Sequence, residues 1–452
     1  MKILFVSLGC DKNRVDTEVM LGYLSQHGHE FTDDEELAEA VVINTCCFIG
    51  DAKEESINTI LEMAERRKSG QLKALIVTGC LAQRYKEEII KEIPEVDKII
   101  GITAIDKIVE AVDETIAKTG KKTFFEDLDR APFGDNRRVQ TTGGNYNYLK
   151  IAEGCNKKCT YCIIPKVRGS YRSVPMEQLI SEANRLAEAG VSELILVAQE
   201  TTLYGVDLYG KKSLPELLHK LGQIDGIKWI RVLYLYPEEM TPEIIAAIKN
   251  EPKVCHYIDI PIQSGSDNVL KRMGRATNNA EIRERIAYVR QEIPDICIRT
   301  TFIAGFPGET ADDFNQTMKL IEDVKFDRVG AFAYSQEEDT PAADMPDQVS
   351  ERVKKTRRTK IMKAQQEIAF ESARNTVGRV IPAVIEGRIT DSDDTDGLTY
   401  VARTYKDAPD VDGYLFINGV QRELMSGDFV TVKVTGSYEY DLIGELCDES
   451  SK

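Results

Sequence analysis

The chain has 452 residues, of which 42% are hydrophobic and 29% charged, and this composition predicts two or three globular domains rather than a disordered chain. A formal net charge of −17 argues against a protein that grips nucleic acid with its whole surface. No apolar stretch is long enough to span a membrane, and the N-terminal apolar run is too short for an export signal. We therefore expect a cytoplasmic protein without membrane contact, whose ten cysteines bind metal or catalyse rather than form disulfides.

Residues 1–130 alternate short apolar runs with helical patterns, which predicts an N-terminal doubly wound parallel sheet domain of the α/β class. No phosphate-binding Gly-x-Gly-x-x-Gly follows the first strand, so a nucleotide site here is not expected. The expected strands are Lys2–Ser7, Ala40–Asn44 and Ala74–Thr78, and the expected helices are Asp16–Gln26, Asp51–Lys68 and Glu87–Ile93.

Residues 131–144 are rich in turn-forming residues and predict a linker, after which strand–helix alternation resumes over residues 145–375. Six strand–helix units are too few for a closed eight-fold barrel, so we expect a partial, open (β/α)6 barrel. A basic helix, Glu351–Ser372, trails this domain; a solvated face is favoured over contact with RNA. The expected strands are Tyr148–Ala152, Glu193–Ala198, Trp229–Leu235, Tyr257–Ile262, Cys297–Ala304 and Arg328–Tyr334, and the clearest helices between them are Met176–Ala189 and Asn279–Ile293.

The last segment, residues 376–452, loses the helical period and shows short alternating runs such as Phe429–Val434. This pattern predicts a small all-β domain of about five strands.

Cys155, Cys159 and Cys162 form a Cys-x3-Cys-x2-Cys motif just past the first expected barrel strand, at the edge where barrel enzymes place their sites. Three thiolates can hold three irons of a 4Fe–4S cluster and leave the fourth iron open to chelate S-adenosylmethionine (SAM). One electron from such a cluster can cleave the sulfur–C5′ bond of SAM and release a 5′-deoxyadenosyl radical. A structural zinc site is the alternative, but no fourth ligand occurs from Asn156 to Arg172.

Three further cysteines, Cys10, Cys46 and Cys80, each follow one of the first three strands. Because the carboxyl ends of parallel strands line one crevice, we expect these thiols to converge and hold a second 4Fe–4S cluster with an open iron. Cys47 is adjacent to Cys46, and neighbours in an extended chain point in opposite directions. We therefore expect Cys46, and not Cys47, to be the ligand.

Several tracts around these cysteines resemble the methylthiotransferases, which are radical SAM enzymes with an added N-terminal cluster domain and a C-terminal TRAM domain. The resemblance covers essentially the whole chain, and a C-terminal tract, 402–413, is similar to the branch of the family that modifies a ribosomal protein. Cys47 stands where the family carries a small residue. The matching tracts are Ser7–Asn13, Asn44–Cys46, Ala152–Cys162, Pro261–Ser266 and Gly305–Glu309.

This resemblance implies two 4Fe–4S clusters, SAM as cofactor, and transfer of a methylthio group to the β-carbon of an aspartate in small-subunit ribosomal protein twelve, either free or on the ribosome. The sulfur would be held at the N-terminal cluster and its methyl group supplied by a second SAM. The reaction needs a sulfur donor and an electron donor, which the sequence does not identify. The SAM contacts that the resemblance and the strand-end positions suggest are Tyr161, Gln199, Gln263, Arg299 and Phe306.

Two other functions share these cysteines: a methylthiotransferase that modifies an adenosine of transfer RNA, and a non-catalytic iron–sulfur carrier. An open iron argues against the carrier, because electron relay needs no vacant coordination site. The charge of residues 376–452 argues against RNA, because seven Lys and Arg residues stand against fifteen Asp and Glu residues, a net charge of −8. An acidic domain attracts a basic partner, so we expect a basic ribosomal protein as substrate.

Overall fold

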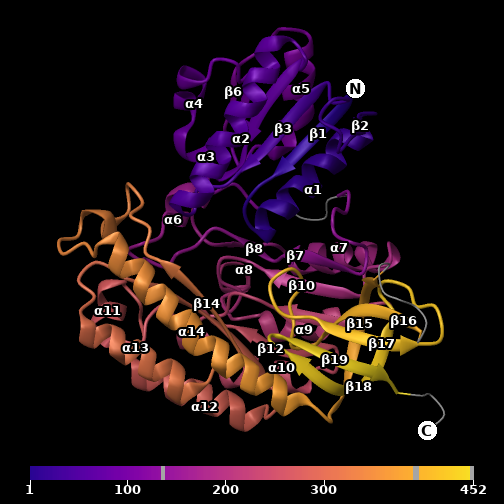
Figure 1. The fold of residues 1–452 in the computed structure, drawn as a ribbon. Coiled ribbons are helices and arrows are strands. Elements are labelled where there is room, and N and C mark those ends of the chain that lie inside the picture. Colours follow the sequence, from indigo (N-terminus) through magenta and orange to yellow (C-terminus); the bar gives the residue numbers. More distant parts are fainter. Residues whose placement is uncertain (134–137, 390–396, 448–452) are drawn as a thin grey trace.

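Two six-stranded parallel sheets and a closed five-stranded barrel follow one another along the chain (Figure 1). The computed structural model describes residues 1–133, 138–389 and 397–447. Among these residues, no helix is both long and apolar enough to cross a membrane.

The N-terminal sheet has the strand order β2-β1-β3-β4-β5-β6, and its strand pairs are parallel. Apolar side chains on one face of the sheet pack against α2, α3 and α4, and those on the other face pack against α1 and α5. The doubly wound arrangement is therefore confirmed. Its strands are β1 (Lys2–Ser7), β2 (Glu30–Phe31), β3 (Ala40–Thr45), β4 (Ala74–Thr78), β5 (Lys98–Ile100) and β6 (Thr123–Phe124), and its helices are α1 (Asp11–Gln26), α2 (Gly50–Ser69), α3 (Gly79–Tyr85), α4 (Glu87–Glu92) and α5 (Ile108–Ile116).

Several features of this domain differ from the sequence prediction, which contained neither the strands β2, β5 and β6 nor the helix α5. Helix α1 begins at Asp11 rather than Asp16, because its polar first turn is buried against the second sheet, where Lys12 is 7% exposed. Helix α3 was not predicted, because its seven residues are too few to show a helical period.

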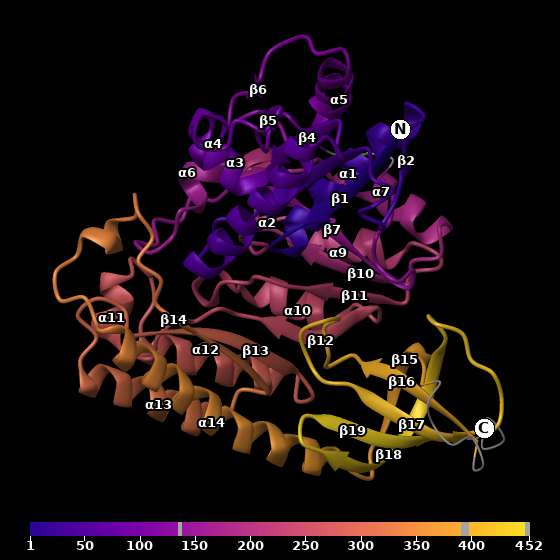
Figure 2. The ribbon, with the colours of Figure 1, turned by 45° about the horizontal axis from the view of Figure 1, so that its top comes forward.

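The second sheet has the order β14-β13-β12-β11-β10-β7, with its strand pairs parallel and its two edges unjoined (Figure 2). Six strands in an open sheet confirm the predicted architecture. One face packs on helices α7, α9, α10, α12, α13 and α14. The strands are β7 (Tyr146–Lys150), β10 (Glu193–Val197), β11 (Trp229–Val232), β12 (Val254–Asp259), β13 (Cys297–Ala304) and β14 (Arg328–Ala333), with a short pair β8 (Ala152–Glu153) and β9 (Arg172–Ser173) beside them. The helices are α6 (Ile164–Arg168), α7 (Met176–Glu188), α8 (Val206–Tyr209), α9 (Leu214–Gly222), α10 (Pro242–Asn250), α11 (Asp267–Arg272), α12 (Asn279–Glu292), α13 (Ala311–Val324) and α14 (Glu351–Thr376).

The C-terminal strands close into a barrel in the order β15-β16-β17-β19-β18, which confirms the predicted five-stranded β domain. It lies against the face of the second sheet opposite to the helices, where Val384 and Ala408 join Tyr146 and Trp229 in one apolar cluster. Its strands are β15 (Val380–Arg388), β16 (Leu398–Thr404), β17 (Leu415–Val420), β18 (Phe429–Tyr438) and β19 (Asp441–Leu446).

Buried ion pairs fix this barrel to the second sheet. Glu193 on β10 pairs at 2.8 Å with both Arg231 on β11 and Arg403 on β16, and the side chains of all three residues are at most 1% exposed. Removing one member would leave a buried charge without its partner, which typically costs 3–5 kcal/mol. The barrel is therefore held in one position on the sheet.

Two connecting segments are also bound to the domains beside them. Residues 138–144 carry no helix or strand, yet Thr141 donates its backbone N–H to the Glu18 carboxylate at 2.7 Å; residues 134–137 of the predicted linker lie outside the described part. In the basic helix α14, Arg357 donates to Glu309 and Arg358 to the Ala331 carbonyl. Part of its basic run thus serves packing rather than solvation.

Candidate active site

The three N-terminal cysteines lie where β1, β3 and β4 end and the next helix begins. Cys10 is exposed and immediately precedes α1, whereas Cys46 and Cys80 are each 6% exposed. Burial, reinforced by the charges of Cys80 and Cys10, raises the pKa of the Cys46 thiol to about 12. Asn13 of α1 contacts both the Cys80 sulfur at 3.8 Å and the Thr45 carbonyl oxygen at 3.0 Å, so the ends of the three strands lie close together.

Two glycines make this convergence possible. Gly9 has φ +93°, and a Cβ there would lie 2.9 Å from the Cys46 sulfur. Gly79 has φ +92°, and a Cβ there would lie 2.4 Å from the Thr45 carbonyl oxygen. Both positions combine a left-handed backbone with contact too close for any side chain. The Gly-Cys pairs at the ends of β1 and β4 are therefore required by packing.

Cys47 has different surroundings from Cys46. It is 1% exposed and belongs to the apolar cluster on the α2 side of the sheet. Burial raises the pKa of its thiol to about 12, with the Cys80 charge adding to the shift and Arg84 opposing it. Cys46, by contrast, lies against Gly9 in the Cys10 loop.

Cys155, Cys159 and Cys162 lie on the loop that follows β7 and β8 and precedes α6. The loop is fixed by backbone hydrogen bonds from Thr160 to Met273 and from Cys162 to Cys159. Burial raises the pKa of the Cys162 thiol to about 12, and the charges of Cys159 and Cys155 add to the shift. The three cysteines thus share one short, fixed loop, and their joint binding of a cluster stays a prediction.

No three His, Cys, Asp or Glu side chains of the described residues meet closely enough to bind one metal ion. A 4Fe–4S cluster differs from a single ion in this respect, because each cysteine binds a different iron and the ligands stand farther apart. The arrangement argues against the alternative of structural zinc at the Cys155 motif.

An aromatic wall stands beside the Cys155 loop. Tyr161 packs edge-on against Phe306 at 6.4 Å, and Phe306 packs against Tyr334 at 5.4 Å. Phe306 was predicted as a SAM contact, but it is fully buried and supports Tyr161 from behind. Phe306 directly follows β13 and lies in one apolar cluster with Tyr334 and α11, and its contact with SAM stays a prediction.

Gln199 and Gln263 lie at the carboxyl ends of β10 and β12, as predicted. Each has a buried side-chain carbonyl oxygen without a hydrogen-bond partner. Buried polar atoms are rarely left unpaired in proteins, so two of them at one sheet edge favour a polar ligand.

The contact of Arg299 with SAM also stays a prediction. Arg299 is the third residue of β13, far from the carboxyl end of that strand. Its guanidinium pairs with Asp259 at 3.3 Å and lies 3.9 Å from Asp412 of the C-terminal barrel. Arg299 therefore belongs to the contact between the sheet and the barrel.

Glu200 and Lys157 were not predicted, although Glu200 directly follows Gln199 at a strand end. Glu200 is 1% exposed, its Oε2 atom has no partner, and Lys157 lies 3.6 Å from its Oε1 atom. Burial raises the pKa of Glu200 to about 7 despite the opposing charge of Lys157. A buried carboxylate oxygen without a partner suits a ligand that carries an ammonium group.

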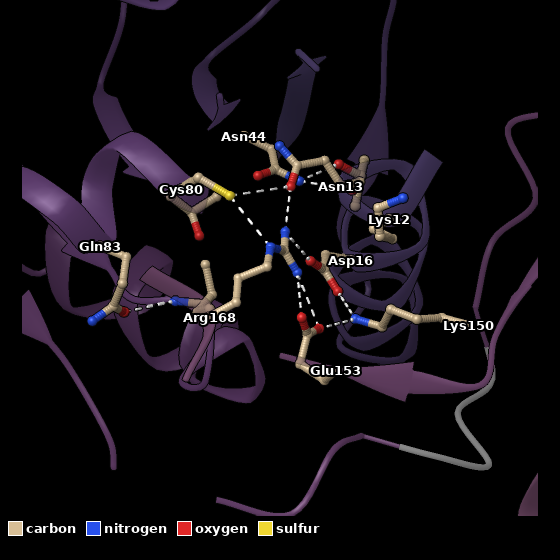
Figure 3. Close-up of polar contacts among 12 residues, drawn as sticks. Lys12, Asn13, Asp16, Asn44, Cys80, Gln83, Lys150, Glu153 and Arg168 are labelled. Carbon is tan, nitrogen blue, oxygen red and sulfur yellow. Dashed lines mark hydrogen bonds and ion pairs between the residues drawn. The ribbon is translucent and has the colours of Figure 1, made fainter. Parts of the chain in front are cut away.

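A buried polar junction joins Cys80 of the N-terminal cysteine group to residues beside the second sheet (Figure 3). Arg168 on α6 contacts the Cys80 sulfur and also pairs with Asp16 and Glu153, while Lys150 pairs with the same two carboxylates. The two sheets therefore face each other with their cysteine-bearing carboxyl edges.

A cavity of about 270 Å³ opens beside Cys10. All three parts of the protein contribute to its walls, which include Arg14 from α1, Tyr234 from the second sheet and Asp410 from the C-terminal barrel. Cys10 is thus the member of the N-terminal group that a bound molecule can approach.

Comparison with known families defines the class of protein. Residues 2–101 match the family described as Uncharacterized protein family UPF0004, residues 149–321 match the Radical SAM superfamily, and residues 377–447 match the TRAM domain. Among solved structures, the radical S-adenosylmethionine methyltransferase TsrM from Kitasatospora setae aligns with a TM-score of 0.56 at 11% identity, covering 73% of this chain and 72% of that one, which supports the fold alone. The chain is a radical SAM enzyme with an additional domain at each end.

Relatives of known type narrow this class. Ribosomal protein uS12 methylthiotransferase RimO of Lachnoclostridium phytofermentans is 59% identical over 98% of this chain and 99% of the relative. The protein of the same description from Trichlorobacter lovleyi is 48% identical over 99% of this chain and 98% of its own length. The one from Clostridioides difficile is 47% identical over 99% of both chains. The chain belongs to the RimO family of methylthiotransferases, which confirms the resemblance seen in the sequence.

The raised pKa of Glu200 generates a prediction about stability. The folded protein binds a proton at Glu200 more tightly than the unfolded chain, so this carboxyl should lower stability as pH rises from about 4.5 to about 7. Glu200→Gln should remove this loss. The change that it causes in the free energy of unfolding of the cluster-free protein should therefore be more stabilising at pH 8 than at pH 5, by on the order of 3 kcal/mol. Urea unfolding at both pH values measures the difference.

Glu239→Gln is the matched control, because this neighbour also pairs with Lys157. Burial opposes ionisation of Glu239, but hydrogen bonds from Lys157 and Lys212 outweigh it and lower the pKa. Its replacement should therefore destabilise the protein at pH 8. The same sign for both variants would contradict the assignment.

Proposed function

We propose that this enzyme adds a methylthio group to the β-carbon of an aspartate in ribosomal protein uS12. The proposal is carried by one observation: two groups of three cysteines lie on facing carboxyl edges of two parallel sheets, joined by Arg168. The full-length similarity to proteins described as ribosomal protein uS12 methylthiotransferases supports this substrate.

Cys155, Cys159 and Cys162 would hold one 4Fe–4S cluster, and Cys10, Cys46 and Cys80 the other. Three thiol donors in each group fit such a cluster with one iron left for another ligand. When bound, the first cluster and SAM would supply the carbon radical that removes a hydrogen, and the second would hold the sulfur to be inserted.

Residues around the Cys155 loop would bind and orient SAM. Glu200 is placed to pair with its ammonium group, and the unpaired oxygens of Gln199 and Gln263 can accept hydrogen bonds from it. Tyr161, held by the fully buried Phe306, would form an apolar side of the pocket. The Lys157 ammonium pairs with the Glu239 carboxylate at 2.6 Å and so neutralises part of the negative charge around this pocket.

The aspartate of the substrate would enter through the cavity beside Cys10, because the other two N-terminal cysteines are buried. Asp11 and Lys12 keep Cys10 in place there, since Lys12 lies 3.5 Å from the ring centre of Tyr234 and pairs with Asp11 at 3.0 Å.

The acidic C-terminal domain supports a basic protein substrate rather than RNA, but with a correction. Asp407 and Asp412 are buried: Asp407 pairs with Arg328 at 2.7 Å, and Asp412 accepts a hydrogen bond from Tyr257 at 2.8 Å. These two side chains fix the barrel to the second sheet and attract no partner. The remaining acidic run, Asp391, Asp393, Asp394 and Asp396, lies outside the described residues.

Replacing each cysteine group should separate the two halves of the reaction. Cys155, Cys159 and Cys162 replaced together by Ala should leave one cluster and abolish SAM cleavage. Replacing Cys10, Cys46 and Cys80 should leave SAM cleavage intact and stop sulfur insertion. Iron analysis and 5′-deoxyadenosine release measure both; loss of SAM cleavage in the second variant, with its remaining cluster intact, would contradict this division.

Cys46 and Cys47 provide a matched pair of variants. Cys46→Ala should lose or destabilise the N-terminal cluster, because its sulfur lies against the Cys10 loop. Cys47→Ala should keep the full iron content. Equal loss of iron in both variants would require a different ligand set.

The choice of substrate can be tested through charge. Reversing Asp391, Asp393, Asp394 and Asp396 to Lys should slow modification of isolated uS12, most strongly at low salt, because complementary charge acts mainly on the rate of encounter and is screened by salt. Reversal of Asp33, Asp34, Glu35 and Glu36, an exposed acidic run on the N-terminal domain, is the control and should have little effect. Unchanged activity of the first variant, or efficient modification of transfer RNA by the intact enzyme, would exclude the role of the C-terminal charge.

A further inference from the structure

Arg168, on helix α6 beside the second sheet, contacts the N-terminal cysteine group at Cys80. It is 1% exposed, and its Nε atom donates to the Cys80 sulfur at 3.4 Å (Figure 3). One terminal nitrogen donates to Asn13 at 2.5 Å, and the other to both carboxylate oxygens of Glu153 at 2.9 and 3.0 Å. The planar guanidinium is suited to serve these three partners at once.

The position of Arg168 in the chain ties it to the other cysteine group as well. It ends helix α6, which begins two residues after Cys162. The next residue, Gly169, accepts a hydrogen bond from the backbone N–H of Cys155 at 3.1 Å. Both ends of the Cys155–Cys162 loop are therefore attached to the element that carries Arg168.

The charges around Arg168 are balanced. Arg168 and Lys150 face Asp16 and Glu153, and the side chains of all four are less than 10% exposed. Asn13, the other neighbour of Cys80, is itself held by donating to the Leu8 and Thr45 carbonyl groups. Arg168 is thus the cation in direct contact with the Cys80 sulfur.

We propose that Arg168 is a positioning residue that sets the reduction potential of the N-terminal cluster and fixes this cluster relative to the other. The inference rests on the proposed function, since it assumes a cluster on Cys10, Cys46 and Cys80. Reduction adds negative charge to a cluster, and an N–H donor or a cation at a ligand sulfur stabilises that charge. Arg168 supplies both and makes reduction easier.

The test uses the full chain with Cys155, Cys159 and Cys162 replaced by Ala, so that one cluster remains. In this background Arg168→Gln combined with Glu153→Gln removes the contact with Cys80 while keeping the buried charges balanced. Reduction of the cluster should become about tenfold less favourable, which is a shift of about 59 mV to more negative potential. Arg168→Lys, which keeps the charge and loses the Nε donor, should shift it less in the same direction. A redox titration followed by electron paramagnetic resonance measures the potentials.

Arg84→Gln is the matched control. Arg84 also joins the N-terminal domain to the second sheet, through Glu337 and the Glu338 carbonyl, and its side chain is 5% exposed. Its loss should lower the thermal unfolding temperature of the cluster-free protein without moving the potential.

The outcomes separate the inference from the proposed function. Absence of iron from the background protein with Arg168 intact would remove the proposed N-terminal cluster itself. A cluster whose potential is the same with Arg, Lys or Gln at position 168 would overturn the inference and leave Arg168 a purely structural ion-pair partner.

Discussion

The arrangement of the whole molecule depends on one constraint, which is that two parallel sheets turn their carboxyl edges toward each other. Strands β1, β3 and β4 end in one cysteine group, and the loop after β7 and β8 carries the other. The edge of one sheet would be an ordinary ligand site. The two edges are held against each other by the buried ion pairs of Arg168 and Lys150 with Asp16 and Glu153.

The repeating patterns of the sequence were sufficient to predict the architecture. β4 and β13 have the predicted bounds, and the six-stranded open sheet and the five-stranded barrel follow from hydrophobic period alone. The cysteines could be grouped because each stands at a strand end, a position that a sequence reveals once the strands are identified. Gly9 and Gly79 belong to the same local pattern, although the reason for them, the close approach of Cys46 and Thr45, appears only in three dimensions.

Contacts between the three parts of the chain had no signal in the sequence. Arg168 looks like one more basic residue after a cysteine motif, and its partner Cys80 is 88 residues away. Arg299 and Phe306 were predicted as SAM contacts from their nearness to a strand end, but the contact of Arg299 with the C-terminal barrel and the packing of Phe306 in the core could not be read from the sequence. Asp407 and Asp412 show the same limit, because counting charges does not distinguish a surface carboxylate from one that pairs with a buried arginine.

The buried charges also restrict how a protein substrate can reach the thiols. Separating the N-terminal domain from the second sheet would break the ion pairs of Arg168 and Lys150 with Asp16. This separation costs several kcal/mol, because it leaves buried charges unpaired. Moving the C-terminal barrel away would do the same to Glu193 and Arg403. Neither interface is therefore a gate that thermal motion opens easily. The cavity beside Cys10, at about 270 Å³, has room for a few side chains but not for a helix or a folded domain. Under the proposed function, a cavity of this size requires that the substrate present its aspartate at the tip of an exposed loop.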